Sequence, residues 1–595
     1  MKKILVHNFT RLGDLLQSTP LLMGLKAQDP RCEITLTVHQ TFQEICRGFP
    51  FVDEVISFDS DRLKEAIVRG GEGLLQGYRY VKSYVQLLKE RRFDLVFNLS
   101  HSRASCMLLA LLDIPQVRGS VADRTGALYT MHPWANYFKN MALHRTIPAF
   151  NLVDVYRRMG DVVHSPRRLV YEAPPGAQAS VERFLDGMAG EDLLIGFQPG
   201  ASEDSRQWPV SAFASLGKAL CTELGARLIV FGTKKEAPLG EEIVKECHGR
   251  AISVMGETSL AELAALLQRC RLLVTNDTGT MHLACAVGTQ VVALFMGPAL
   301  FHQTGPYGAG HVVLQAEIPC APCNYLVRCS HHVCKEHVRL DAVFQTVKWV
   351  VEAFKVQGAR FNVQGSTSNG HPLPVPPPSR GRVGVGGHAV LSSPPDLGPG
   401  LGGYISGFDE DGYVQFYPLS KRRLDWVTLL RLGYREAWKV VLDGKPLGQA
   451  LAAAKDDIAA HYVCAGGTDG LEQEPDEILQ NFDRLRSLAQ QGATLSQDLV
   501  HEASGKPWRV GRIQALGKAL EELDEQISVL GGTGEELKPF TAMFRFGKQN
   551  LQGGELLPLA QQTLQLYETL VRQSEVTSRV LADLHPLSPV ANRGR

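Results

Sequence analysis

The sequence predicts an α/β fold with two doubly wound units, a Gly/Pro-rich linker and a mainly helical C-terminal domain. Strand-like and helix-like stretches alternate from residue 1 to about 120, and the alternation resumes at residue 193. Strands that alternate with helices form parallel sheets with right-handed crossovers. Two such units in succession are expected to face a cleft, with ligands at the carboxyl ends of the strands.

Each α/β unit is predicted from short apolar runs separated by helical patterns. In the first unit we expect strands at residues 4–6, 34–38, 54–58 and 94–99, and a helix at 74–90. In the second unit we expect strands at 194–197, 228–231, 252–254, 272–275 and 291–295. Its helices are expected near 212–224, 236–247, 261–268 and 281–287.

The linker and the tail follow from composition and periodicity. Nearly half of residues 365–403 are Gly or Pro, which cannot bury enough apolar surface to offset ordering entropy. Residues 403–416 alternate like a hairpin around Asp409–Gly412. Beyond them, a heptad seam indicates an antiparallel helical bundle, with self-association or partner docking as the alternative. The seam is formed by Ile513, Leu516, Leu520, Leu523, Ile527 and Leu530, with a weaker one at Leu559, Leu566, Leu570, Val580 and Leu584.

These patterns predict four regions. They are an N-terminal Rossmann-like domain at 1–180, a C-terminal Rossmann-like domain at 181–357, a disordered linker at 358–403 and a mainly α-helical domain at 404–595. The role of the last region does not follow from its sequence.

Charge and hydropathy restrict the location and partners of the chain. The formal net charge of the 595 residues is zero, which gives no support for nucleic-acid binding. Residues 1–180 carry about six more Lys and Arg than Asp and Glu, which suits an anionic partner, although scattered solvated Arg would explain it equally well. No signal peptide and no membrane span is visible. We therefore expect a cytoplasmic protein, in peripheral contact with a membrane at most; Lys421-Arg422-Arg423 with Trp426 would suit anionic lipid, but also an ordinary helix start.

The first candidate site lies where the first strand runs into a helix, at Arg11-Leu12-Gly13-Asp14. A carboxylate at this position satisfies orphan N–H groups at a helix start, which is the structural interpretation of Asp14. The functional interpretation is a general base at the mouth of the cleft. The residues alone favour the helix cap.

The second candidate site is the turn Asp277-Thr278-Gly279-Thr280 with His282, which follows an apolar run and precedes a helix. Free N–H groups at such a helix start bind phosphate well, and Gly279 lets the backbone approach a ligand closely. Asp277 can accept hydrogen bonds from sugar hydroxyls, and His282 can face the phosphates, although a structural histidine is the commoner case.

A third stretch, Pro199-Gly200-Ala201-Ser202, also ends a strand, and Arg206 follows it. Ser202 is a candidate substrate ligand, and Arg206 can bind a phosphate through its bidentate guanidinium group. The alternative is a surface arginine ahead of an ordinary helix start at Trp208-Pro209.

Together, these three pieces resemble the heptosyltransferases of glycosyltransferase family 9. The resemblance covers residues 1–355 or so and rests on the order and spacing of three segments. They are Arg11 to Pro20, Pro199 to Ser202 with Trp208-Pro209, and Thr275 to Ala284. It implies a GT-B fold and inverting, metal-independent transfer of heptose from ADP-heptose to the inner core of lipopolysaccharide.

The resemblance also implies roles for individual residues. Asp14 would be the base, and Arg206 would stand where the family often has a lysine on the diphosphate. Asp277, Thr278, Gly279 and Thr280 would hold the diphosphate and sugar, and Glu236 is a candidate for the ribose. The partners would be a nucleotide sugar and a lipopolysaccharide core acceptor.

Four cysteines, Cys320, Cys323, Cys329 and Cys334, lie within fifteen residues. One C-x2-C pair with two further thiols has ligand-like spacing for structural zinc. Unligated thiols are the principal alternative, and a disulfide or a cluster is the other. No cofactor is expected to be required for catalysis.

Two other functions are compatible with the sequence. One is a transferase or epimerase acting on another sugar nucleotide, which fold alone cannot separate from a heptosyltransferase. A dehydrogenase-type epimerase would need a dinucleotide G-x-G-x-x-G motif after the first strand, and residues 7–14 lack it. The other is a degenerate, non-catalytic scaffold acting through its helical tail, against which the presence of Asp14 and Asp277 argues.

Overall fold

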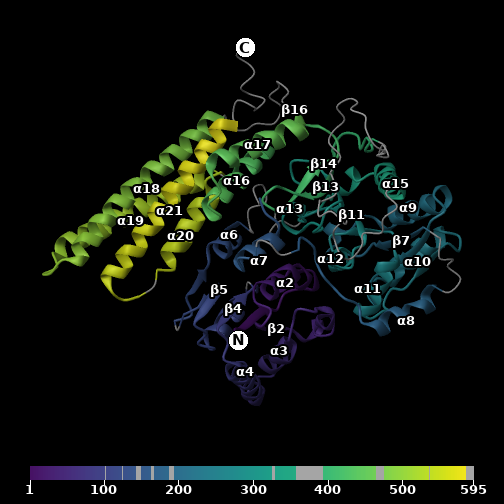
Figure 1. The fold of residues 1–595 in the computed structure, drawn as a ribbon, viewed down its shortest axis with the longest axis horizontal. Coiled ribbons are helices and arrows are strands. Elements are labelled where there is room, and N and C mark those ends of the chain that lie inside the picture. The colour runs from purple at the N-terminus through teal and green to yellow at the C-terminus, as the bar shows by residue number, and fades with distance from the viewer. Residues whose placement is uncertain are drawn as a thin grey trace, which may run out of the picture. The chain divides into compact units, whose positions relative to one another are not determined.

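In the computed structural model, the chain folds into two compact units (Figure 1). The first holds residues 1–100, 114–116 and 150–420, and the second holds 101–113, 117–149 and 421–595. The residues described are 1–100, 102–123, 125–141, 149–162, 166–185, 193–323, 329–356, 393–463, 475–534, 536–551 and 553–584.

The first sheet has six strands, and its parallel part runs in the order β3-β2-β1-β4. These strands are β1 (Lys3–Asn8), β2 (Glu33–His39), β3 (Glu54–Phe58) and β4 (Leu95–Asn98). The intervening helices are α1 (Leu12–Gln17), α2 (Thr19–Gln28), α3 (Ser60–Arg69) and α4 (Glu72–Arg91), with 3-10 turns η1 (Gln40–Phe42) and η2 (Ile45–Gly48). Because the crossover direction reverses at β1, its carboxyl end lies at the topological switch point of this sheet.

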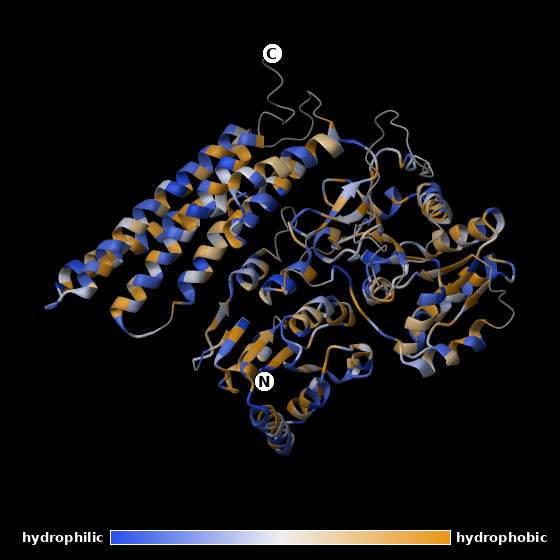
Figure 2. Ribbon diagram, viewed as in Figure 1, coloured by the Kyte–Doolittle hydropathy of each residue, from blue (hydrophilic) through white to orange (hydrophobic). Residues whose placement is uncertain are grey.

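The second sheet has eight strands, in the order β14-β13-β12-β11-β10-β7-β8-β9. Its parallel part consists of β7 (Leu194–Gln198), β8 (Arg227–Val230), β9 (Ala251–Ser253), β10 (Leu272–Asn276), β11 (Gln290–Phe295) and β12 (Val312–Ala316). This is the 3-2-1-4-5-6 order of a dinucleotide-type doubly wound sheet, with its switch point between β7 and β10. Figure 2 shows these strands as hydrophobic, as expected for a sheet covered on both faces.

The helices of the second sheet include α9 (Val210–Glu223), α10 (Ala237–Glu246), α11 (Leu260–Arg269), α12 (Gly279–Ala286) and α15 (Leu340–Val356). Shorter elements are η3 (Asp204–Arg206), η4 (Lys234–Glu236), α13 (Phe301–Thr304) and α14 (Cys334–His337). In the sequence, α7 (Leu152–Met159) and α8 (Pro175–Leu185) lie between the strands of the first sheet and those of the second.

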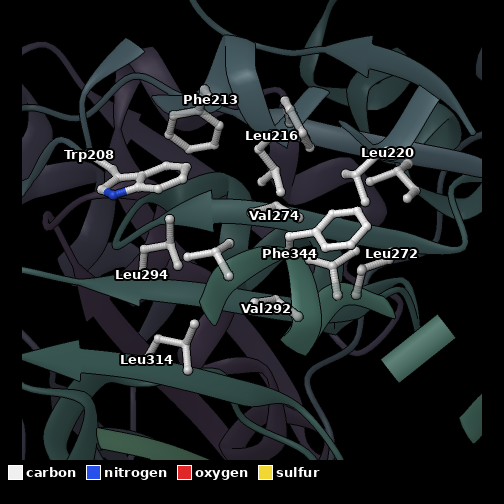
Figure 3. Packing of buried hydrophobic residues seen from close by; sticks show 14 of the residues in the cluster. Trp208, Phe213, Leu216, Leu220, Leu272, Val274, Val292, Leu294, Leu314 and Phe344 are labelled. Carbon is white, nitrogen blue, oxygen red and sulfur yellow. The ribbon is translucent and has the colours of Figure 1, made fainter. Parts of the chain in front are cut away.

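Apolar side chains between α9, α15 and the second sheet form a continuous core (Figure 3). Trp208 lies fully buried at its edge, where its indole ring meets Phe213 edge-on at 5.1 Å and its Nε1 donates to the carbonyl oxygen of Val338. The predicted Trp208-Pro209 helix start is therefore a core anchor as well as the beginning of α9.

The predicted hairpin is confirmed, but it belongs to the second sheet. β13 (Leu401–Phe408) and β14 (Val414–Pro418) pair antiparallel, and β13 also pairs antiparallel with β12 in the register Val312↔Ile405. The boundary expected at residue 404 thus falls inside β13, and residues up to Ser420 group with the two α/β sheets. Alternation predicts a strand without predicting which strand it pairs with.

The structure describes only the C-terminal end of the linker predicted at 358–403. Residues 358–392 lie outside the described residues, whereas residues 393–403 are described. Leu397 is buried in the core of the second sheet, and Arg339 donates through Nη2 to its carbonyl oxygen at 2.8 Å. A single well-placed leucine is enough to anchor this Gly/Pro-rich stretch, because it contributes apolar burial that its neighbours lack.

A fully buried polar network joins the hairpin to α7. Asp154 forms an ion pair with Arg157 at 3.1 Å, accepts from the hydroxyl of Tyr307 at 2.8 Å and accepts from the backbone N–H of Val414 at 2.8 Å. Arg157 also donates to the carbonyl oxygen of Gly412 at 3.2 Å. All of these groups have partners within the network, as a buried charge requires.

In the second unit, α18 (Pro475–Ser504), α19 (Val510–Thr533) and α21 (Leu556–Leu584) are the longest helices, and α18 packs against both of the others (Figure 1). The unit also holds α16 (Trp426–Leu442), α17 (Leu447–His461), α20 (Lys538–Gln549) and the short strands β15 (Arg422–Arg423) and β16 (Tyr462–Val463). The heptad positions from Leu516 to Leu530 are buried, which confirms the predicted bundle. Self-association stays a prediction.

The second unit also contains a part of the chain from before residue 150. This part consists of α5 (Arg103–Ala110), the antiparallel pair β5 (Gln116–Ala122) and β6 (Leu128–Met131), and α6 (Pro133–Met141). Tyr137 of α6 meets the ring of Trp438 at 5.4 Å, and Trp134 donates through Nε1 to Asp443 at 3.1 Å. α6 thus packs against α16 and α20 of the helical bundle. Among the described residues, none of the helices has both the length and the apolarity to cross a bilayer.

We expect Asp154→Ala to lower the free energy of unfolding by about 3–5 kcal/mol, because it leaves the buried guanidinium of Arg157 without its carboxylate. Chemical denaturation followed by circular dichroism measures the change. Glu65→Ala is the matched control, because it removes an exposed ion pair with Arg69; its effect should be about 0.5 kcal/mol or less. Equal effects of the two substitutions would contradict a stabilising role for the network.

Candidate functional site

The two turns singled out in the sequence both lie at switch points. The Arg11–Asp14 turn follows β1 and begins α1, and the Asp277–Thr280 turn follows β10 and begins α12. The last residue pair in the register of β10 with β7 is Thr275↔Gln198, so the Pro199–Ser202 turn leaves the sheet beside the Asp277 turn. The structure thus collects the predicted residues at the sheet ends where α/β proteins bind ligands.

The starts of α1 and α12 lie in direct contact. A Cβ atom placed on Gly13 would stand 2.8 Å from Cδ2 of His282 and 3.8 Å from the Cα of Gly279. A Cβ atom on Gly279 would meet the side chain of Leu12 at 3.2 Å. Glycine is needed at position 13 because any side chain would collide with the histidine ring. The contact brings Asp14 of the first sheet to the helix start of the second.

Asp14 lies at the third position of α1 and is only partly exposed. Its Oδ2 accepts from the backbone N–H of Arg11 at 3.4 Å, and its Oδ1 accepts from Nε2 of Gln17 at 3.5 Å. Burial raises the pKa of Asp14 above its ordinary value, and the hydrogen bonds from Arg11 and Thr10 offset only part of this rise. The carboxylate therefore both caps its helix and has the raised pKa that suits a base.

Arg206 and Asp277, assigned separate ligand contacts from the sequence, form an ion pair with each other. Nη1 of Arg206 lies 3.1 Å from Oδ2 of Asp277, and both side chains are nearly buried. The pair holds the guanidinium group at the end of β10, beside the start of α12. The sequence contained no signal for this pairing, because the two residues lie in different turns.

The helix start of α12 has no side-chain cap. Thr278 is its N-cap residue, but its side chain does not cap the helix and instead lies 3.3 Å from the hydroxyl of Thr275. The first N–H groups of α12 thus have no side-chain cap, which leaves them able to bind an anion. The hydroxyl of Thr280 donates to Oε1 of Gln198 at 3.1 Å, which ties this helix start to the end of β7.

His282 is buried in the first turns of α12, and desolvation lowers its pKa to about 4. The ring is neutral at physiological pH and adds no positive charge for a phosphate. Its Nδ1 is buried and has no hydrogen-bond partner within the described part of the chain. His282 therefore lies at the candidate site, as the sequence suggested, but it carries no charge.

Glu236 and Ser202 lie near the Gly200 turn. Glu236 accepts from the backbone N–H and the hydroxyl of Thr233, at 2.7 and 2.9 Å, and so caps η4. A Cβ atom on Gly200 would overlap the Glu236 carboxylate, which places that carboxylate directly against the turn. Ser202 is exposed in the loop that follows. Their contacts with a substrate stay predictions.

Two residues of this region were missed in the sequence. Asn276 donates through Nδ2 to the carbonyl oxygen of Pro199 at 2.7 Å and accepts from the backbone N–H of Trp208 at 3.1 Å, so it joins the two ligand turns. Its place at the end of β10, directly before Asp277, was the available signal. Tyr156 of α7 is fully buried, and the charge of Asp14 contributes to raising its pKa, with burial as the main cause. No motif marks Tyr156.

The four cysteines of the predicted zinc site differ in burial. Cys334 is buried in the core of the second sheet, whereas Cys320 is exposed, and residues 324–328 between them are outside the described residues. In the parts of the chain that are described, no group of three or more His, Cys, Asp or Glu side chains is placed to hold a metal ion. Structural zinc stays a prediction that metal analysis of the purified protein would test.

Two doubly wound sheets whose ligand turns meet define a transferase-like α/β architecture of the GT-B type. A solved family 9 glycosyl transferase from Veillonella parvula has the same fold, with a TM-score of 0.50 and 22% identity over 59% of this chain and 97% of that one. Residues 81–331 match the model of glycosyltransferase family 9 (heptosyltransferase).

Two curated relatives extend the match in sequence. The chain is 28% identical to lipooligosaccharide heptosyltransferase 2 of Haemophilus influenzae, over 51% of this chain and 85% of that protein. It is 27% identical to lipopolysaccharide heptosyltransferase 2 of Salmonella typhimurium, over 50% of this chain and 83% of that protein. Over residues 81–331 the chain is thus similar to the heptosyltransferases of glycosyltransferase family 9, and these relatives support a glycosyltransferase.

We expect Gly13→Ala to impair sugar transfer, because the new methyl group would stand 2.8 Å from the buried His282 ring. Overpacking of this kind costs about 1–3 kcal/mol and would separate the two helix starts. Steady-state transfer rates and thermal unfolding measure both effects.

Gly176→Ala is the matched control, because a Cβ atom there meets nothing within 4 Å and the residue also lies in a helix. If the Gly13→Ala variant transfers sugar at the rate of the Gly176→Ala control, close contact of the two helix starts is not required for activity.

Proposed function

We propose that this chain moves a heptose from ADP-heptose to the inner core of lipopolysaccharide at the cytoplasmic face of the membrane, with inversion and without a metal. The observation that carries the proposal is the contact between the Gly13-Asp14 turn and the start of α12. It places a carboxylate with a raised pKa next to an uncapped helix start. The similarity to heptosyltransferases is the basis for the proposed sugar and for the proposed class of acceptor.

In this proposal Asp14 accepts the proton of the acceptor hydroxyl as that oxygen attacks the anomeric carbon. The carbon passes through an oxocarbenium-like state, as in glycoside chemistry generally. The bond to the diphosphate breaks from the opposite side, so the configuration inverts. The raised pKa of Asp14 makes it a stronger base than an exposed aspartate.

The departing diphosphate gathers negative charge that the second sheet is arranged to stabilise. The N–H groups of Thr278, Gly279 and Thr280 at the start of α12 supply a positive dipole end. Arg206 supplies a full charge, held in place by Asp277. These groups perform the role that a metal ion performs in other transferases, which is the physical basis for proposing metal independence.

The test is transfer by the full chain from ADP-heptose to a heptose-deficient lipopolysaccharide core. Two quantities are measured: the ADP that is released and the mass of the acceptor. UDP- and GDP-sugars are run in parallel. We expect Asp14→Asn to lower turnover at least about 100-fold, since a general base contributes at least that much. Asp341→Asn, which changes an exposed aspartate, is the control. Turnover of Asp14→Asn within tenfold of the wild type would remove Asp14 from the base role.

The pH dependence of kcat/KM gives a second measure of the same assignment. Protonated Asp14 cannot accept a proton, so activity should fall on the acid side. Because burial raises the pKa of Asp14, the fall should begin at a higher pH than the ordinary aspartate value of about 4. Circular dichroism over the same range checks that the protein remains folded. A flat profile down to pH 4 in folded protein would contradict the proposed base.

For the donor side, we expect Asp277→Ala to weaken binding of the nucleotide sugar at least about tenfold, since a charge-assisted hydrogen bond contributes about 1.5–3 kcal/mol. The change removes an acceptor for sugar hydroxyls and releases Arg206 from its position. Isothermal titration calorimetry measures it. Glu182→Ala, which breaks an exposed ion pair with Arg269, is the control. An unchanged affinity would count against the assignment of Asp277.

A further inference from the structure

The helical hairpin α3–α4 ends in a cluster of exposed apolar side chains. Val68 is 86% exposed and Tyr78 is 63% exposed, although both belong to helices of the first unit. The cluster, called the α3–α4 tip below, consists of Ile67, Val68, Leu74, Leu75 and Tyr78. Large exposed apolar groups scattered singly are ordinary, but five within twelve residues form a patch that indicates an interaction.

The exposed side chains are not needed to hold the hairpin together. α3 and α4 approach through small residues: a Cβ atom on Gly77 would stand 3.3 Å from that of Ala66 and 3.2 Å from the side chain of Leu63. A Cβ atom on Gly73 would collide with the carbonyl oxygen of Ala66 at 2.6 Å. The helices are thus in contact along their small residues, and the larger apolar residues near the turn stay exposed.

The turn itself projects into open space. Gly70 and Gly71 both have positive φ angles, of 64° and 47°, and a Cβ atom on either would meet nothing within 4 Å. The end of the hairpin is therefore narrow and free of covering side chains among the described residues. Such a shape can enter a deformable surface.

Charge indicates which surface this is. Residues 60–82, which surround the tip, carry five Lys and Arg against three Asp and Glu. Two of the three carboxylates are already paired, Asp61 with Lys64 and Glu65 with Arg69, which leaves Arg62, Arg79 and Lys82 against Glu72. Arg62 lies 4.9 Å from the ring centre of Tyr80. Apolar side chains next to excess positive charge are the combination that binds an anionic bilayer, where apolar groups enter the headgroup boundary and cations attract the lipid charge.

We propose that the α3–α4 tip docks this chain on an anionic lipid bilayer. The five apolar side chains enter the boundary between headgroups and acyl chains, and Arg79 and Lys82, which follow the tip on α4, contact the lipid phosphates. The proposal deepens the proposed function, on which it rests for the lipid-anchored acceptor, because it states which part of the acceptor-side domain meets the membrane.

The basic segment Lys421-Arg422-Arg423, considered for this role from the sequence, is used within the fold instead. Lys421 donates through Nζ to the carbonyl oxygen of Ala459 at 3.0 Å, and Arg422 is partly buried in β15. The α3–α4 tip has no such use. It is therefore the better candidate among the described residues.

The test is sedimentation of the full chain with vesicles of phosphatidylglycerol and phosphatidylethanolamine, compared with vesicles of phosphatidylcholine alone. We expect binding to the anionic vesicles, and at least about tenfold weaker binding for the double variant Val68→Asp/Leu74→Asp, given the apolar area each side chain would bury. Val510→Asp/Val529→Asp is the matched control, because both valines are 59% exposed on α19. The control should bind within twofold of the wild type.

Activity separates this proposal from the proposed function. The tip variant should keep wild-type transfer to a water-soluble core fragment and lose it, about tenfold, with acceptor embedded in vesicles. Equal vesicle binding by the tip variant and the control would overturn the proposal, as would failure of the wild type to bind anionic vesicles. A wild-type dimer in sedimentation velocity that the tip substitutions convert to monomer would also overturn it, in favour of a second copy as the occupant. Absence of heptose transfer would overturn the proposed function while leaving the vesicle result intact.

Discussion

The candidate site depends on the close contact between the first turns of α1 and α12. Gly13 and Gly279 are the residues that permit this contact, and His282 fills the space between the helices. Both helices begin at the switch points of their sheets. The contact between them therefore sets the position of Asp14 relative to Thr280 and to the Arg206–Asp277 pair. A shift of either helix start would move the carboxylate of Asp14 away from the uncapped N–H groups of α12.

In the proposed function, one side of this region accepts a proton and the other side holds an anion. The first sheet contributes an aspartate whose pKa is raised by burial. The second contributes an uncapped helix start, a paired arginine and a histidine that is neutral because it is desolvated. The neutral histidine is informative, since it allows close packing of the two helices without placing a second buried charge beside Asp14.

Much of the α/β fold could be predicted from the sequence, because its strands are apolar runs that end in Gly, Asp or Thr. The ranges expected for β1, β2, β3 and β4 and for β7 to β11 are confirmed within a few residues. The two main ligand turns were visible for the same reason. The pairing of Arg206 with Asp277 was not, because the residues are far apart in the sequence and each suits an exposed role.

Other features were beyond local sequence patterns. Asn276 connects two turns through backbone groups, and its side chain carries no motif of its own. The strand β12 and the helices α6 and α15 were not predicted, and the partner of the hairpin could not be chosen from alternation alone. The exposed apolar residues of α3 and α4 were missed because an apolar position in an amphipathic helix ordinarily indicates the core.

The pairing of β13 with β12 determines where a fragment of this chain can end. A fragment ended after α15, where the family resemblance ends, would leave β12 as an open sheet edge with unpaired backbone groups. It would also remove the Gly412 carbonyl and the Val414 N–H from the buried charges of α7. Recombinant fragments of the α/β part should therefore extend through Ser420, and shorter ones should be prone to aggregate for reasons unrelated to catalysis.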